Sequence, residues 1–167
     1  MAESTVFVTV GTTKFDLLIK TLCQPEVLSL LEYMKYTRIL MQIGKGEYIP
    51  KIEDKKIGIT LEYYTLKKSI AADMQQASLV ISHAGAGSIF ESLNAKKQLL
   101  VVVNEMLMDN HQLELAQHLA KEGYLIYTTC EYLKETLAGI DFSNLKPYVP
   151  GNPKGITDYL DKQFGFK

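Results

Sequence analysis

Three short segments combine glycine or polar side chains in a way that could bind a phosphorylated ligand. They are Gly11-Thr12-Thr13, His83-Ala84-Gly85-Ala86-Gly87-Ser88 and the stretch 104–112. The second is the most informative, because small residues let a ligand approach the backbone and a following helix offers free N–H groups to an anion. It lacks the third glycine of G-x-G-x-x-G, and no Walker lysine follows it. The segment therefore predicts a diphosphate site, with a tight strand-to-helix turn that binds nothing as the alternative.

The carboxylate of Glu91 has two interpretations. Glu91 lies three residues after Ser88 and could accept hydrogen bonds from both hydroxyls of a ribose. The same spacing matches a capping box, in which a serine and a glutamate close the first turn of a helix. Thr13 and Asp16 repeat this spacing after the first segment. A ligand contact and a helix cap are therefore both open for Glu91.

The third segment carries side chains that suit the hydroxyl groups of a sugar. Sugar binding requires several hydrogen-bond donors and acceptors, and four side chains here offer them: Asn104, Asn110, His111 and Gln112. Helix capping is again an alternative, with Asp109 at the N-cap and Gln112 three residues later.

The sequence lacks the patterns of several catalytic classes. Ser88 has no G-x-S-x-G elbow, the chain contains no Asp-x-Asp, and its three histidines do not form a metal triad. We therefore expect no metal and no cofactor. His83 is the candidate general base, although its place beside a phosphate site suits ligand contact better.

The composition is that of an ordinary globular protein, with 47% hydrophobic and 22% charged residues. A net charge of −1 offers no basic face for nucleic acid. The longest aliphatic run, 99–103, is far shorter than the ~20 residues of a membrane span, and residues 2–5 show no signal peptide. Cys23 and Cys130 lie far apart and form no disulfide framework. These features favour a cytoplasmic protein with reduced thiols.

Strands and helices are expected to alternate along a single domain, residues 1–167. Apolar runs predict strands at 5–10, 38–43, 57–63, 79–82, 98–103 and 124–128. Helical periodicity predicts helices at 15–23, 25–35, 67–76, from 88, at about 110–122, at 131–138 and at about 154–164. This alternation indicates an α/β fold, a Rossmann-like parallel sheet with helices on both faces. Ligands bind such sheets at the carboxyl ends of the strands, so the three segments should line one edge.

In combination, the motifs resemble one known family. They are VFVTVGTT at 6–13, QIGKG at 42–46, LVISHAGAGS at 79–88 and NEMLMDNHQLELA at 104–116. From about residue 6 to residue 129 the chain resembles the catalytic, cytosolic subunits of the eukaryotic UDP-N-acetylglucosamine transferase of asparagine-linked glycosylation.

The resemblance implies a donor-binding subunit that needs a partner. Its fold would be the C-terminal half of a GT-B glycosyltransferase of the family 28 type, similar to the donor domain of the bacterial transferase that makes lipid II. In this family the acceptor half is a separate, membrane-anchored protein. The pair transfers GlcNAc from UDP-GlcNAc to GlcNAc-diphospho-dolichol on the cytosolic face of the endoplasmic reticulum, with inversion and without an essential metal. A subunit of a two-part polysaccharide glycosyltransferase of the bacterial type, using another UDP-sugar, and a non-catalytic nucleotide-sugar-binding module are the alternatives.

The resemblance also implies a role for each motif. The segment 11–13 and the segment 83–88 would face the diphosphate from two sides, Glu91 would bind the ribose, and His111 and Gln112 would hold the sugar. A backbone group near Leu66 is a candidate for reading uracil.

The chain departs from the family in two places. It has Lys96-Lys97-Gln98 where relatives often have Gly-Lys-Pro, so Asn94 is expected to take the helix-ending conformation. The tail at about 140–167 diverges and is a candidate partner-docking segment. Its apolar residues are Ile156, Tyr159, Leu160, Phe164 and Phe166.

Overall fold

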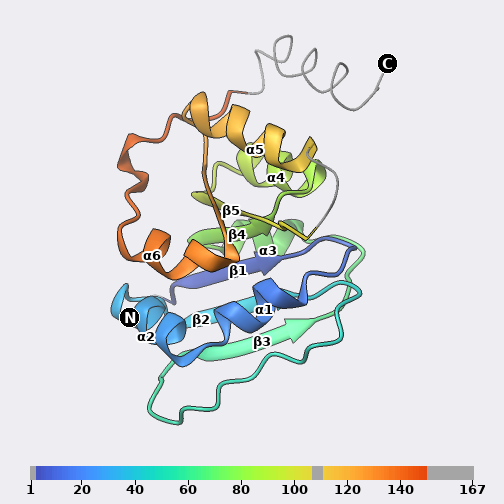
Figure 1. The fold of residues 1–167 in the computed structure, drawn as a ribbon. Coiled ribbons are helices and arrows are strands. Elements are labelled where there is room, and N and C mark those ends of the chain that lie inside the picture. The colour runs from blue at the N-terminus through green and yellow to red at the C-terminus, as the bar shows by residue number, and fades with distance from the viewer. Residues whose placement is uncertain (1–2, 107–110, 150–167) are drawn as a thin grey trace.

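The computed structural model describes residues 3–106 and 111–149, which fold around one six-stranded sheet (Figure 1). The strands lie in the order β3-β2-β1-β4-β5-β6, and every neighbouring pair is parallel. The predicted Rossmann-like parallel sheet is thereby confirmed. The strands are β1 Thr5–Thr9, β2 Arg38–Gln42, β3 Thr60–Tyr64, β4 Leu79–His83, β5 Leu99–Val103 and β6 Ile126–Thr129.

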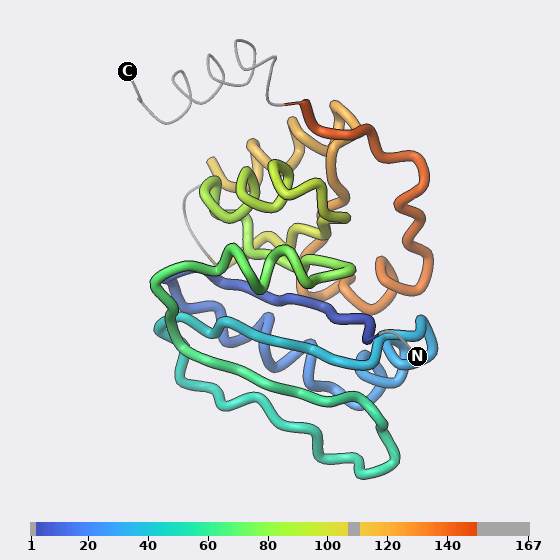
Figure 2. The backbone as a smooth tube through the Cα atoms, turned by 180° about the vertical axis from the view of Figure 1, so that it is seen from behind, coloured from blue at the N-terminus to red at the C-terminus, as the bar shows by residue number. Residues whose placement is uncertain are grey.

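Helices cover both faces of the sheet, as Figures 1 and 2 show from opposite sides. The helices are α1 Asp16–Leu22, α2 Pro25–Tyr33, α3 Ala71–Gln76, α4 Ala86–Asn94, α5 His111–Lys121 and α6 Leu133–Ala138. Short 3-10 turns lie at Cys130–Tyr132 and Phe142–Asn144. α1, α2 and α6 pack against one face, and α3, α4 and α5 pack against the other.

The side chains of β1 explain how one strand supports both layers. Val6 and Val8 belong to the core under α1 and α2, whereas Phe7 belongs to the core under α3 and α4. Successive side chains of a strand point to opposite faces, so a strand buried on both sides must be apolar throughout. β1, β4 and β5 are buried at every position, and they form the centre of the sheet.

The strand order reverses between β1 and β4. From β1 the chain continues to β2 and β3 on one side, and it then returns to β4 on the other side of β1. Thr9 of β1 and Ser82 of β4 are register partners, so the turns that follow these two strands start side by side. In open α/β sheets such a reversal creates a crevice at the carboxyl ends of the strands, where ligands bind.

Several element boundaries differ from the sequence prediction, among them the starts of β3, α3 and α4. β3 begins at Thr60 rather than residue 57, because Arg38, the first residue of β2, has Thr60 as its register partner. α3 begins only at Ala71, whose N–H bonds to the Ser69 hydroxyl at 3.2 Å. α4 begins at Ala86, two residues earlier than predicted.

The predicted left-handed conformation of Asn94 at the end of α4 is wrong. Asn94 is still helical, and the left-handed residue is Lys96, with φ 60°. The N–H groups of Lys96 and Lys97 bond to the carbonyls of Leu93 and Ser92, as in a helix C-cap. By contrast, it is a glycine, Gly123, that takes a positive φ, of 89°, just after the end of α5.

Over residues 3–106 and 111–149, no helix combines the length and the apolar character that a membrane crossing would need. The predicted terminal helix at 154–164 and its apolar docking residues lie outside the described residues.

Candidate functional site

The two glycine turns meet around the imidazole of His83. A Cβ atom on Gly11 would lie 2.8 Å from Nε2 of His83, and one on Gly85 would lie 2.3 Å from Cε1 of the same ring. Gly11 also has φ 63°, a conformation that other residues rarely adopt, and its N–H bonds to the Thr9 hydroxyl at 2.9 Å. The ring therefore occupies space that only glycine leaves free on both sides.

The three segments singled out in the sequence converge on one small pocket. Its volume is about 90 Å³, and it is lined by Thr13, Lys14, Phe15, His83, Asn104 and Gln112. These residues follow β1, end β4, follow β5 and begin α5, so the expectation that the segments line one edge of the sheet is confirmed. The pocket lies where the strand order reverses.

The first turn of α4 begins directly after the second glycine turn, beside this region. The N-cap of α4 is Gly85, which provides no side-chain cap. The N–H groups of the first helical turn have no partner within the helix and attract anions. Among residues 3–106 and 111–149, no atom would lie within 4 Å of a Cβ atom on Gly87, apart from the neighbouring backbone of the helix itself. The Ser88 hydroxyl lies 3.4 Å from Nε2 of His83 and joins the helix to the glycine turns.

The capping interpretation of Glu91 is wrong. Ser88 is the third residue inside α4 rather than its N-cap, so Ser88 and Glu91 cannot form a capping box. The half-buried Glu91 shows no side-chain hydrogen bond or ion pair within residues 3–106 and 111–149. Glu91 follows Gly87 by four residues, which places both on the same face of the helix, one turn apart.

The capping interpretation also fails for Thr13 and Asp16. The Thr13 hydroxyl donates to the carbonyl of Val10 at 2.8 Å, which closes the turn after β1. The Asp16 carboxylate accepts the N–H of Glu47 at 3.1 Å, and the N-cap of α1 is Phe15. Both side chains hold turns together at the carboxyl edge of the sheet.

Burial lowers the pKa of His83 to about 4. Only 8% of the residue is exposed, so the charged imidazolium loses its hydration. A group with this pKa is a weak proton acceptor at neutral pH, which argues against His83 as the general base. We therefore assign it to ligand contact, as a neutral ring.

The low pKa of His83 predicts a stability change in acid. The unfolded histidine has a pKa of ~6.5, so between about pH 6.5 and 4 the unfolded chain binds more protons than the folded chain. Folding stability linked to His83 is therefore complete above pH 6.5 and falls as the pH drops toward 4. We expect the ring resonances of His83 to stay constant in NMR spectra from pH 8 to about pH 5. A titration midpoint near 6.5 would contradict this buried, neutral ring.

The remaining predicted site residues lie in different surroundings, and not all of them line the pocket. The Asn104 side-chain carbonyl accepts the N–H of Met106 at 3.0 Å, which leaves its amide N–H groups for a ligand. His111 is exposed at the start of α5, with Nδ1 3.6 Å from the Glu114 carboxylate. Leu66 is 48% exposed beyond β3 and does not line the pocket. Asn110 and the capping candidate Asp109 lie outside the described residues.

Lys14 and Phe15 line the pocket but were not among the predicted site residues. Their position directly after Gly11-Thr12-Thr13 was the available signal, because the residues that follow such a turn share its edge of the sheet.

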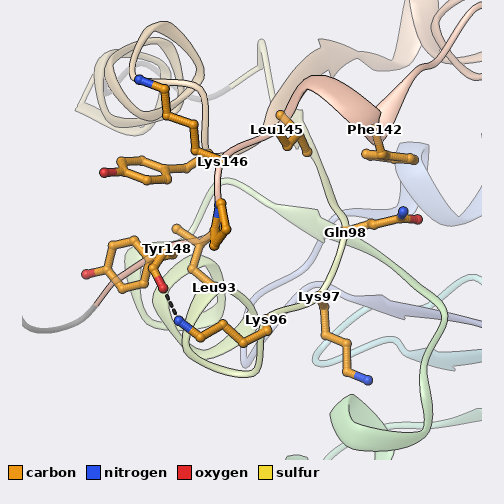
Figure 3. Close-up of a pocket in the computed structure, with 10 residues that line it drawn as sticks. Leu93, Lys96, Lys97, Gln98, Phe142, Leu145, Lys146 and Tyr148 are labelled. Atoms are coloured by element: carbon orange, nitrogen blue, oxygen red, sulfur yellow. Dashed lines mark hydrogen bonds between the residues drawn. The ribbon is translucent and has the colours of Figure 1, made fainter.

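A larger pocket of about 220 Å³ lies away from these turns, beside the segment that precedes β5 (Figure 3). Two of the three lysines that line it bond to backbone carbonyls. Lys96 donates to the carbonyl of Tyr148, and Lys97 donates to those of Gln75 and Ala77 at 2.7 and 3.0 Å. These bonds hold the segment 142–149 and the end of α3 against α4, so we interpret this pocket as structural.

Within residues 3–106 and 111–149, no three His, Cys, Asp or Glu side chains lie close enough to hold a metal ion together.

Comparison with known proteins gives the family. The model of the glycosyltransferase family 28 C-terminal domain matches residues 5–155. A Kluyveromyces lactis protein named UDP-N-acetylglucosamine transferase subunit ALG13 is 33% identical over 195 residues, covering 97% of this chain and 94% of that relative. The chain belongs to glycosyltransferase family 28, among the ALG13-type subunits. The resemblance found in the sequence is thereby confirmed.

The human relative of this family 28 chain is much longer. The human protein, also named UDP-N-acetylglucosamine transferase subunit ALG13, is 52% identical over 128 residues, which cover 77% of this chain. The chain spans only 11% of the length of the human protein and 11% of its mouse counterpart.

Two solved structures share the fold of this family 28 domain. The solution NMR structure of ALG13 is 25% identical with a TM-score of 0.74, covering 97% of this chain and 98% of that chain. The crystal structure of Acinetobacter baumannii MurG is 19% identical with a TM-score of 0.61, covering 82% of this chain and 40% of that chain. The predicted fold, the C-terminal half of a GT-B glycosyltransferase, is confirmed.

Proposed function

We propose that the chain binds UDP-GlcNAc and, with a membrane-anchored acceptor-binding partner, transfers GlcNAc to GlcNAc-diphospho-dolichol on the cytosolic face of the endoplasmic reticulum. The observation that carries the proposal is the convergence of the turn after β1, the end of β4, the turn after β5 and the start of α5 on one pocket. The start of α4 lies beside it, where the Ser88 hydroxyl is 3.4 Å from Nε2 of His83. The pocket lies at the strand-order reversal of a family 28 domain. The relatives share the name UDP-N-acetylglucosamine transferase subunit, which indicates UDP-GlcNAc as the sugar nucleotide.

The free N–H groups at the start of α4 suit a diphosphate leaving group. In a direct displacement at the anomeric carbon, negative charge grows on the UDP oxygens as the bond to the sugar breaks. The positive end of a helix dipole and oriented N–H groups stabilise such charge. Gly87 leaves these groups accessible to a ligand, since no atom of the described residues outside the helix's own backbone lies within 4 Å of the position of a Cβ there. We propose that this reaction proceeds with inversion and without an essential metal.

The acceptor hydroxyl needs a general base, and we propose that the partner provides it. Burial and the low pKa make His83 unsuitable. We also propose that Asn104, Gln112 and the exposed His111 bind the hydroxyl groups of the sugar. A uracil contact near Leu66 would lie beyond β3, outside the small pocket.

UDP and UDP-GlcNAc are expected to stabilise the purified chain against heat. A ligand that binds only the folded state at ten times its Kd adds about 1.4 kcal/mol, which corresponds to a few degrees in Tm. A chelator should leave this shift unchanged, and ATP and NAD should not produce it. The measurement is a melting curve in the presence of each ligand. A shift with ATP or NAD, and none with UDP, would show that the pocket serves another class of ligand.

Transfer itself is tested with the partner present. The chain alone should transfer GlcNAc negligibly to a soluble GlcNAc-diphospho-lipid, and activity should appear when the membrane-anchored partner is added. Transfer by the chain alone would contradict the split between donor and acceptor subunits. Transfer from another UDP-sugar by the pair would favour a polysaccharide-type enzyme, and binding without transfer would favour a non-catalytic module.

A further inference from the structure

The pocket between the three turns has a lysine at its rim. Lys14 directly follows Gly11-Thr12-Thr13, and among the described residues that line the pocket it alone carries an ammonium or guanidinium group. His83, the other basic residue there, is neutral at neutral pH because burial lowers its pKa to about 4. Among the described residues of the lining, Lys14 therefore carries the one full positive charge.

The ammonium group of Lys14 is held loosely. Its Nζ lies 3.7 Å from Oδ2 of Asp16 and 3.5 Å from Oε1 of Glu47, and about half of the side chain is exposed. Both distances exceed those of a strong charge-assisted hydrogen bond, and ion pairs exposed to water contribute little. A ligand with a higher charge density can therefore displace these carboxylates.

The two carboxylates differ in what else they do. Asp16 accepts the N–H of Glu47 at 3.1 and 3.3 Å, so it holds the turn after β2 in place. The side chain of Glu47 is 84% exposed, and within the described part of the chain its one ion pair is with Lys14. Glu47 can therefore be neutralised without loss of a structural contact.

We infer that Lys14 pairs with the diphosphate of the nucleotide, and that Glu47 competes with the nucleotide for this lysine. The inference rests on the proposed function and adds a specific residue to it. A lysine is a point charge on a flexible stem, which suits a phosphate group that arrives beside a set of N–H groups. The recognised chemistry is the diphosphate, so the nucleoside part should bind without help from Lys14.

The experiment compares UDP with uridine as ligands of the full chain, by calorimetry for UDP and by NMR titration for uridine. Lys14→Met should weaken UDP about tenfold, the effect of one hydrogen bond to a charged group, and leave uridine unchanged. Lys14→Arg, which keeps the charge, should stay close to the wild type. Glu47→Gln should strengthen UDP binding about twofold, because the competing charge is gone.

Lys55→Met is the matched control. Lys55 is exposed in the loop before β3, and the described part of the chain shows no ion pair for it. This variant removes the same charge from the surface and should leave the Kd of UDP unchanged. Raising the salt concentration should weaken UDP binding to the wild type more than to Lys14→Met, since a screened ion pair is involved.

The outcomes separate this inference from the proposed function. If the wild type binds UDP and Lys14→Met binds it equally well, the inference is wrong and the proposed function stands. If Lys14→Met weakens UDP and uridine alike, Lys14 shapes the pocket rather than pairing with the diphosphate, and the inference is again wrong. If the wild type does not bind UDP, both are wrong.

Discussion

Gly44→Ala is expected to destabilise the folded chain by about 2–5 kcal/mol, the combined cost of a left-handed non-glycine residue and of a steric overlap in a packed region. Gly44 follows β2 with φ 59°. A Cβ atom there would lie 2.2 Å from the backbone oxygen of Thr13 and 2.9 Å from that of Gly11. Both neighbours are main-chain atoms, so no side chain can rotate away to make room.

The same substitution should also impair donor binding. The N–H of Lys45 bonds to the carbonyl of Thr13 at 2.9 Å, which ties the turn after β2 to the turn after β1. A methyl group on Gly44 would push these two turns apart. Gly11-Thr12-Thr13 would then move away from His83 and the pocket. The measurement is the urea midpoint of unfolding, together with a UDP titration under conditions in which the variant is folded.

Gly87→Ala is the matched control for the stability measurement. Gly87 lies inside α4, and a Cβ atom there would have no atom of the other described elements within 4 Å. Alanine is the better helix former by up to ~1 kcal/mol, so the variant should be at least as stable as the wild type. UDP binding should nevertheless weaken, because the methyl group enters the space in front of the free N–H groups. Equal stability of Gly44→Ala and the wild type would contradict the packing of the two turns.

The sheet was predictable because its central strands are apolar without interruption. The runs at 79–82 and 99–103 are buried on both faces, and such runs between glycine-containing turns are typical of parallel strands. The order of the strands was not predictable in the same way. Alternating strands and helices fit several orders, and the reversal between β1 and β4 depends on the packing of whole layers.

Element boundaries were predicted wrongly where side chains compete with the backbone for hydrogen bonds. Residues 67–70 have helical spacing, but Lys67 and Tyr64 both bond to the carboxylate of Asp73, at 2.9 and 2.6 Å. The Ser69 hydroxyl accepts the N–H of Ala71, so the helix starts there. Ile57 and Ile59 are buried, but they lie before Thr60, the first residue of β3 that pairs with β2. Their alternating pattern therefore indicated burial rather than strand pairing.

The sequence predicted the main-chain turns of the candidate site better than the roles of its side chains. Glycine-containing turns after strands define where a phosphate can approach, and His83, Asn104 and Gln112 do line one pocket. The role of Glu91 depended on where α4 starts, and a shift of two residues removed the capping interpretation. Lys14 was missed because its position after Gly11-Thr12-Thr13 places it at the right edge of the sheet but does not tell whether it lines a pocket there.

Glu91→Gln is expected to weaken UDP-GlcNAc binding by ~1.5–3 kcal/mol, the range for a hydrogen bond to a charged group. Glu91 lies one helical turn beyond Gly87 on the same face of α4. A nucleotide whose diphosphate binds at the start of the helix would place its ribose at about this distance. A carboxylate can accept both ribose hydroxyls, whereas an amide offers one acceptor oxygen and no charge.

The fold should tolerate this change. Glu91 takes no part in a capping box, because the N-cap of α4 is Gly85. Glutamine has nearly the helix propensity of glutamate, so the free energy of unfolding should change by less than ~0.5 kcal/mol. Glu122→Gln, at an exposed position just after α5, removes a carboxylate of the same kind far from the glycine turns. It should change neither stability nor binding.

A second ligand, 2′-deoxy-UDP, tests the contact between Glu91 and the ribose separately from the other contacts of the nucleotide. The wild type should bind UDP more tightly than 2′-deoxy-UDP, since the deoxy ligand lacks one of the two hydroxyls that Glu91 accepts. Glu91→Gln should bind the two ligands nearly alike, because the charged acceptor that separates them is gone. The measurement is a titration of both proteins with both ligands, alongside melting curves. If Glu91→Gln discriminates between UDP and 2′-deoxy-UDP as strongly as the wild type does, Glu91 does not bind the ribose, and another residue near α4 must.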